Sequence, residues 1–72
     1  MRYIIEAQGY PGGPWQFKAQ FGEKHAHDAC VAGIIGTYEE YKSVDVSKSD
    51  RWVILTIERE TGRERYKLRT EK

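Results

Sequence analysis

The sequence predicts a single α+β domain in which an antiparallel sheet carries one amphipathic helix on one face. One segment with helical periodicity lies between segments in which polar and apolar residues alternate, the pattern of half-buried strands. The expected order of elements is β-β-α-β-β-β, which suits a sheet covered on one side by the helix. With 72 residues and no internal repeat, the chain has room for one hydrophobic core. Residues 1–72 are therefore expected to form one domain.

The first two strands are expected at residues 2–8 and 15–21 and should pair as a hairpin. Between them, residues 9–14 form a cluster of glycine and proline that neither strand nor helix can span. The first strand is expected to place Tyr3, Ile5 and Ala7 on one face. The second strand is expected to direct four apolar side chains to one face, namely Trp15, Phe17, Ala19 and Phe21.

One amphipathic helix is expected to begin near Ala26 and to end around residues 39–42, at Glu39, Glu40 and Lys42. Its apolar positions recur at helical spacing: Cys30, Val31, Ile34, Ile35 and Tyr38. Asp28 would lie in the first turn, where a carboxylate interacts favourably with the positive end of the helix dipole. Gly33 and Gly36 each lower the helix propensity by up to ~1 kcal/mol, so packing must hold this helix in place.

Three further strands are expected at residues 43–47, 51–58 and 64–70, separated by polar turns. In the first of them, Val44 and Val46 alternate with polar residues. In the other two, the core-facing side chains are expected to be Val53, Leu55, Ile57, Tyr66 and Leu68.

The register of the last two strands follows from the turn that joins them. A two-residue turn of Thr61 and Gly62 would place Ile57 opposite Tyr66, both toward the core. A three-residue loop would instead place Ile57 opposite Arg65, a charged residue. The two-residue turn is therefore expected.

The composition indicates a folded domain without a strong electrostatic preference for a partner. Hydrophobic residues make up 39% of the chain, so its charged residues are expected at the surface rather than in a disordered segment. Twelve basic and eleven acidic residues leave a net charge of +1. Cys30 is the only cysteine, which indicates a reducing compartment. The apolar run at residues 3–5 is too short for a signal peptide or a membrane span, so a soluble cytoplasmic protein is expected.

No group of residues in the sequence predicts catalysis, a metal or a bound cofactor. His25, His27 and Cys30 are potential zinc ligands within six residues, but the chain has no other cysteine or histidine to complete a site. No serine, threonine or cysteine has a base and an orienting group arranged with it in a recognisable pattern. The protein is therefore predicted not to be an enzyme and not to bind a metal.

The sheet face away from the helix is the predicted working surface. The fourth strand directs Trp52 and Ile54 to this face. The fifth strand adds an alternating row of cations, Arg63, Arg65, Lys67 and Arg69. The second strand is expected to contribute Gln16 and Lys18.

Two aromatic residues, Tyr10 and Trp15, flank the loop at 9–14, and aromatic residues on loops are over-represented at interfaces. The predicted partner-binding residues are therefore Tyr10, Trp15, Trp52, Ile54, Arg65, Lys67 and Arg69.

The sequence supports three interpretations of this face. The leading one is a protein-docking surface, because tryptophan and arginine are enriched at binding hot spots. The second is single-stranded RNA or DNA binding, in which cations contact phosphates and aromatic rings stack on bases. The third is a homodimer in which two sheets stack face to face. A charged outer strand also protects a sheet edge against aggregation, which requires no partner.

In size, charge balance and order of elements, the chain resembles the small phage-encoded inhibitors of bacterial defence complexes, anti-CRISPR proteins among them. The resemblance lies in the architecture: a strand at Arg2–Glu6, one helix, and a hairpin from Trp52 to Leu68. It implies a non-enzymatic protein in the host cytoplasm that occludes a functional surface of a larger, nucleic-acid-processing complex. Such inhibitors share no sequence signature, so the resemblance assigns no role to any residue.

Overall fold

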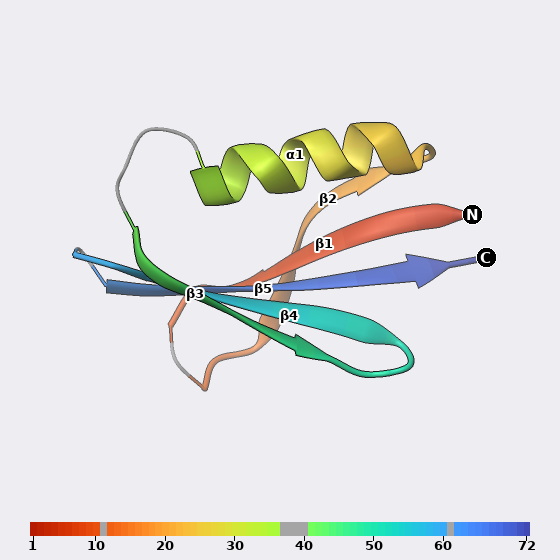
Figure 1. Cartoon of the computed structure of the whole chain (residues 1–72). Coiled ribbons are helices and arrows are strands. Elements are labelled where there is room, and N and C mark those ends of the chain that lie inside the picture. Colours follow the sequence, from red (N-terminus) through yellow and green to blue (C-terminus); the bar gives the residue numbers. More distant parts are fainter. Residues whose placement is uncertain (11, 37–40, 61) are drawn as a thin grey trace.

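The computed structural model describes residues 1–10, 12–36, 41–60 and 62–72 (Figure 1). Its elements are β1 (Arg2–Gln8), β2 (Trp15–Phe21), α1 (Lys24–Gly36), β3 (Tyr41–Lys48), β4 (Trp52–Arg59) and β5 (Gly62–Glu71). The strands form one antiparallel sheet with α1 on one face, so the predicted α+β class and element order are confirmed. The predictions for Tyr38, Glu39, Glu40 and Thr61 fall outside the described residues.

The sheet order is β2-β1-β5-β4-β3, so the first and last strands of the chain are neighbours in its middle. β1 pairs with β5 from Arg2 to Gln8, with Ile5 opposite Leu68. This pairing also brings the two termini side by side (Figure 1). The charged strand β5 is therefore central, and the explanation that its charges protect a sheet edge is wrong.

The register of β4 and β5 differs by two residues from the predicted one. Arg59 pairs with Gly62, which leaves residues 60 and 61 as the connection, and Ile57 lies opposite Glu64 rather than Tyr66. Gly62 has a φ of 140°, a conformation that L-residues with a side chain rarely adopt, so the glycine suits the first position of β5. A shift of two residues keeps every side chain on its predicted face.

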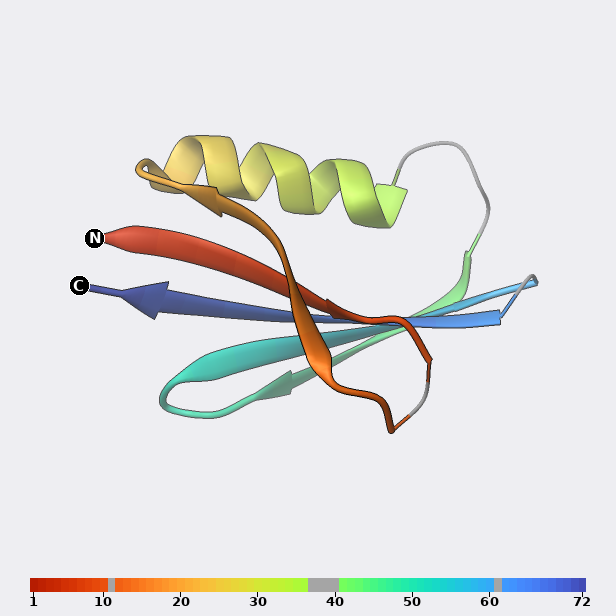
Figure 2. The ribbon, with the colours of Figure 1, turned by 180° about the vertical axis from the view of Figure 1, so that it is seen from behind.

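β2 contains a bulge that divides its apolar residues between the two faces of the sheet. Ile5 pairs with Ala19 and Glu6 pairs with Phe17, so Lys18 is the extra residue. Ala19 therefore shares a face with Ile5, whereas Phe17 shares the opposite face with Glu6. The prediction that Trp15, Phe17, Ala19 and Phe21 share one face is wrong, because pairing skips a residue where the sequence alternates regularly. Figure 2 shows β2 bending across the sheet toward α1.

α1, described from Lys24 to Gly36, begins at Lys24 rather than near Ala26, and the residues that follow Gly36, where its end was predicted, lie outside the described ranges. Asp28 consequently lies beyond the first turn. Lys24 donates a hydrogen bond of 2.7 Å to the Asp28 carboxylate, and this bond lowers the pKa of Asp28. None of the described residues of α1 is fully buried, so the helix depends on a few specific contacts with the sheet.

Two contacts, one near each end, hold α1 on the sheet. The His27 ring lies against two aromatic rings, with centroid distances of 5.6 Å to Tyr3 and 6.3 Å to Phe21. At the other end, the Arg59 guanidinium donates to the carbonyl oxygen of Ile34 at 2.8 Å. This bond satisfies one of the carbonyls that the last helical turn leaves unpaired.

A partly buried network positions Arg59 for that contact. Arg59 Nε donates to Glu64 Oε1 at 3.0 Å, and the Tyr66 hydroxyl donates to the same oxygen at 3.3 Å. Burial raises the pKa of Tyr66, and the nearby Glu64 carboxylate raises it further. Tyr66 is therefore a protonated donor at neutral pH.

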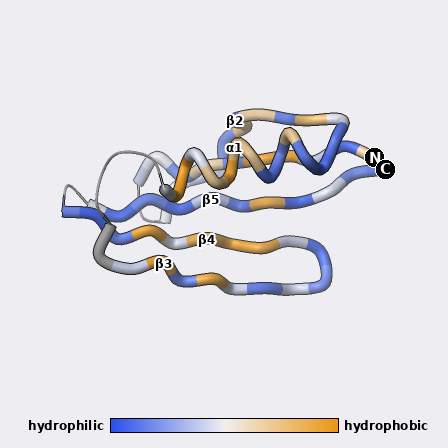
Figure 3. Tube along the Cα trace, turned by 45° about the horizontal axis from the view of Figure 1, so that its top comes forward, coloured by the Kyte–Doolittle hydropathy of each residue, from blue (hydrophilic) through white to orange (hydrophobic). Residues whose placement is uncertain are grey.

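The sheet face toward α1, here called the helix face, carries the most buried side chains. Ile5 and Ile57 have no exposed surface, and Leu55 is also buried. β4 supplies two of these three residues, and its trace is distinctly hydrophobic beside the mostly hydrophilic β5 (Figure 3). The predicted assignment of Leu55 and Ile57 to the core is confirmed.

Candidate docking surface on the outer sheet face

The outer face is the side of the sheet opposite α1, and it carries the predicted residues of β4 and β5. Directly opposed residues of an antiparallel pair share a face. The pairs on this side are Trp52 with Arg69, Ile54 with Lys67, Thr56 with Arg65 and Glu58 with Arg63. The predicted placement of the basic row and of Trp52 and Ile54 on one face is therefore confirmed.

The bulge in β2 adds two aromatic residues to the outer face in place of the two polar ones that were expected. Trp15 pairs with Gln8 and Phe17 with Glu6, both of which belong to the outer face. Gln16 pairs with Ala7, on the helix face. Lys18 also leaves the outer face, because its Nζ lies 5.9 Å from the centroid of the Tyr66 ring.

Lys67 lies between the two tryptophans of the chain. Its Nζ is 4.8 Å from the centroid of the Trp15 ring and 5.9 Å from that of Trp52. The guanidinium carbon of Arg65 is 5.6 Å from the Trp15 ring. These cation–π contacts align two cations with two indoles that come from strands on opposite sides of β5.

The outer cations of β5 differ in whether a carboxylate neutralises them. Arg63 pairs with Glu58 at 2.5 Å, and Arg69 pairs with Glu6 at 2.9 Å and Glu71 at 2.7 Å. The bond to Glu71, followed by that to Glu6, raises the pKa of Arg69.

Within the described residues, Arg65 and Lys67 form no ion pair. Arg65 instead donates to Gln8 Oε1 at 3.2 Å and to Thr56 Oγ1 at 3.4 Å, both neutral acceptors. The positive charge of the outer face is therefore least compensated at Arg65 and Lys67, beside the two indoles.

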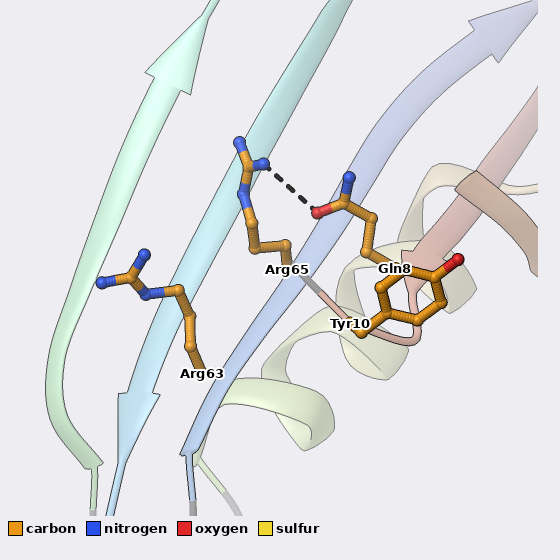
Figure 4. Close-up of a pocket in the computed structure, with 4 residues that line it drawn as sticks. All are labelled: Gln8, Tyr10, Arg63 and Arg65. Carbon is orange, nitrogen blue, oxygen red and sulfur yellow. Dashed lines mark hydrogen bonds between the residues drawn. The ribbon is translucent and has the colours of Figure 1, made fainter. Parts of the chain in front are cut away.

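A shallow depression at one end of the outer face is lined by Gln8, Tyr10, Arg63 and Arg65 (Figure 4). The hydrogen bond from Arg65 to Gln8 crosses it, and Tyr10, which is 64% exposed, forms its rim. The structure thus brings Tyr10 next to the basic row.

Local contacts hold the loop that carries Tyr10. The amide of Gly13 donates to the Tyr10 carbonyl at 3.0 Å, and Gln8 Nε2 donates to the Gly13 carbonyl at 2.9 Å. A Cβ at position 13 would lie 2.8 Å from the Tyr10 ring, so glycine lets the ring pack directly on the backbone. The ring is therefore supported rather than free in solvent.

Exposure separates the outer-face residues into contact and support groups. Phe17 is 65% exposed, and Trp15 and Trp52 are partly exposed. Ile54 lies on the predicted face but is only 8% exposed, and Ile4 is buried on the same face. Ile54 therefore supports the surface, while Phe17, which the alternation had assigned to the same face as Ala19, is available for contact.

Of the histidine and cysteine cluster, His27 takes part in packing. His27 Nδ1 lies 3.1 Å from Asp28 Oδ1, and its ring contacts Tyr3 and Phe21. His25 is exposed and Cys30 is half-buried. In the part of the chain that the structure describes, no three His, Cys, Asp or Glu side chains converge as metal ligands would.

Comparison of the chain with models of protein families, with curated proteins and with solved structures finds no match. Within the described ranges, the structure contains no helix with the length and hydrophobicity needed to cross a bilayer.

Deleting Lys18 is expected to make the pairing of β2 with β1 regular while Trp15 and Phe17 stay on the outer face. Lys18 is the residue that the pairing skips, so without it Phe17 and Ala19 become neighbours in the chain and still lie opposite Glu6 and Ile5. NMR cross-peaks between the Trp15 ring and the Lys67 side chain should therefore persist in the deletion variant. Lys18→Ala keeps the extra residue and should also retain them. Loss of the cross-peaks after the deletion would contradict the assignment of Lys18 as the extra residue.

Proposed function

We propose that the protein is a non-enzymatic binding module whose outer face docks onto an acidic patch of a protein partner. The observation that carries the proposal is the pair Arg65 and Lys67, which lie beside Trp15 and Trp52 without a carboxylate partner among the described residues. A partner carboxylate there would gain charge-assisted hydrogen bonds next to indole rings, the composition of many hot spots.

The charge distribution favours a protein partner over a nucleic acid. Three carboxylates, Glu6, Glu58 and Glu71, lie among the outer cations and would repel phosphates. The net charge of +1 also provides little long-range attraction to a polyanion. We include in the proposal the partner class that the architectural resemblance implies, a larger nucleic-acid-processing complex whose functional surface the module would cover.

Single-stranded nucleic acid is a second candidate ligand, and the position of Lys67 between two indoles supports it. Bases could stack on Trp15, Trp52 and the exposed Phe17 while Lys67 contacts a phosphate. Binding of this kind predicts an affinity for oligonucleotides that falls steeply with salt.

The two candidates are separated by affinity capture from lysate, with and without nuclease, using charge-reversal variants. The test variant is Arg65→Glu with Lys67→Glu. The control, Lys48→Glu with Arg51→Glu, makes the same change in net charge at exposed positions of the β3–β4 hairpin. We expect a protein partner that survives nuclease, and an affinity reduced by roughly 30-fold or more in the test variant only, as for one hot spot.

Equal losses in both variants would contradict a specific role for Arg65 and Lys67. If nuclease treatment removes the captured material, the ligand is a nucleic acid and not a protein. A wild-type protein that sediments as a dimer while the test variant is monomeric would identify the partner as a second copy.

A further inference from the structure

A cleft of about 220 Å³ lies on the helix face, on the opposite side of the sheet from the proposed docking surface. Its walls come from β1, α1, β4 and β5 and include Tyr3, His27, Val53 and Leu68. The cleft exists because α1 packs on β1 and β2, at one side of the sheet, while β5 and β4 continue beyond it (Figure 1). The helix thus leaves part of the apolar helix face uncovered.

Aliphatic and aromatic side chains form most of the surface that lines the cleft. Val53 lies opposite Leu68 on adjacent strands, so their side chains form a continuous apolar floor. The rings of Tyr3 and His27 lie against each other at a centroid distance of 5.6 Å, tilted by 37°. An aromatic molecule in the cleft would therefore meet aliphatic groups on one side and ring edges or faces on the other.

The charges at the rim of the cleft are already paired. Lys24, Asp28 and Arg69 line it. Lys24 bonds to Asp28 at 2.7 Å, and Arg69 pairs with Glu6 and Glu71. Because each charge has its partner, the rim favours an uncharged ligand over an ion.

Two polar side chains of the lining retain hydrogen-bonding capacity. The contact between His27 Nδ1 and Asp28 is satisfied when Nδ1 carries the proton, which leaves Nε2 as an acceptor in the neutral ring. Neither Nε2 nor the Thr70 hydroxyl has a hydrogen-bond partner among the described residues. A ligand with one N–H or O–H group has an acceptor available at this site.

We propose that this cleft binds a small, uncharged aromatic molecule that carries one N–H or O–H donor. The apolar floor selects for an apolar body, the neutralised rim selects against charge, and the remaining acceptors select for the donor. The proposal does not depend on the outer face, which lies on the opposite side of the sheet.

Indole is the probe, added to the isotope-labelled full chain and followed by NMR. We expect saturable shifts of the Val53 and Leu68 methyl groups, with intermolecular cross-peaks from indole to both. 1-Methylindole lacks the donor and should bind roughly fivefold more weakly, the ratio expected for one net hydrogen bond. Equal affinity of the two probes would overturn the part of the proposal that concerns the donor.

A matched pair of variants tests the location. Val53→Phe fills the cleft and should abolish the saturable shifts at Leu68. Val46→Phe makes the same change on the same sheet face, but at a residue that is 54% exposed and outside the cleft, and should leave binding unchanged. If Val53→Phe fails to fold, the cross-peaks in the wild-type protein still decide the question. Absence of saturable shifts at Val53 and Leu68 up to the solubility of indole would overturn the proposal.

Discussion

Replacing Ile57 with alanine is expected to remove most of the free energy of unfolding at 25 °C. Ile57 has no exposed surface and lies between Val44 of β3 and Glu64 of β5. Truncation of a fully buried isoleucine costs about 2–5 kcal/mol, whereas a domain of this length rarely has more than roughly 3–5 kcal/mol of stability. Urea denaturation followed by circular dichroism measures the loss.

Two further substitutions make the Ile57 prediction quantitative. Ile57→Val should cost about 0.5–1.5 kcal/mol and stay folded enough for an accurate measurement. Val46→Ala, at an exposed position of the neighbouring edge strand β3, should change the free energy of unfolding by no more than about 0.5 kcal/mol. If Ile57→Ala were as stable as Val46→Ala, β4 would not form the core described above.

Ile54→Ala is expected to destabilise the protein nearly as much, although Ile54 lies on the face proposed for docking. At 8% exposure its side chain is packed under the outer face, so truncation leaves a cavity and costs about 2–4 kcal/mol. Phe17→Ala on the same face is the contrast, because a ring that is 65% exposed contributes little to folding. It should reduce partner affinity while leaving stability within about 1 kcal/mol of wild type.

The denaturation midpoints and partner affinities of Ile54→Ala and Phe17→Ala are measured together. They check that Ile54 contributes to stability and Phe17 to binding. An Ile54→Ala variant with wild-type stability and reduced affinity would show that Ile54 contacts the partner directly, as the alternation in the sequence first suggested.

Local alternation in the sequence was sufficient to predict which face each residue of β4 and β5 occupies. Val53, Leu55 and Ile57 face the helix, and Trp52 and Ile54 face away, because period-two alternation survives any even shift in register. Because alternation does not distinguish registers that differ by two residues, it also explains why the predicted pairing of β4 with β5 was wrong. A shift of two residues changes the partner of Ile57 without moving any side chain to the other face.

Neither the pairing of β1 with β5 nor the bulge in β2 can be recognised from the local sequence of these strands. β1 and β5 lie at opposite ends of the chain, so nothing in either segment indicates that they are neighbours. The segment from Trp15 to Phe21 alternates without interruption, and the extra residue Lys18 is defined only by its partners in β1. The alternation therefore assigned Phe17 to the same face as Ala19, and β5 was expected to be an outer strand.

Hydroxyl-radical footprinting of the captured complex tests the docking proposal most directly, because aromatic side chains report their own exposure. Docking through the outer face predicts that Phe17, Trp15 and Trp52 become protected on binding, while Tyr3 on the helix face reacts as in the free protein. Protection of Tyr3 with unchanged reactivity of Phe17 would contradict it, since the partner would then cover the helix face instead.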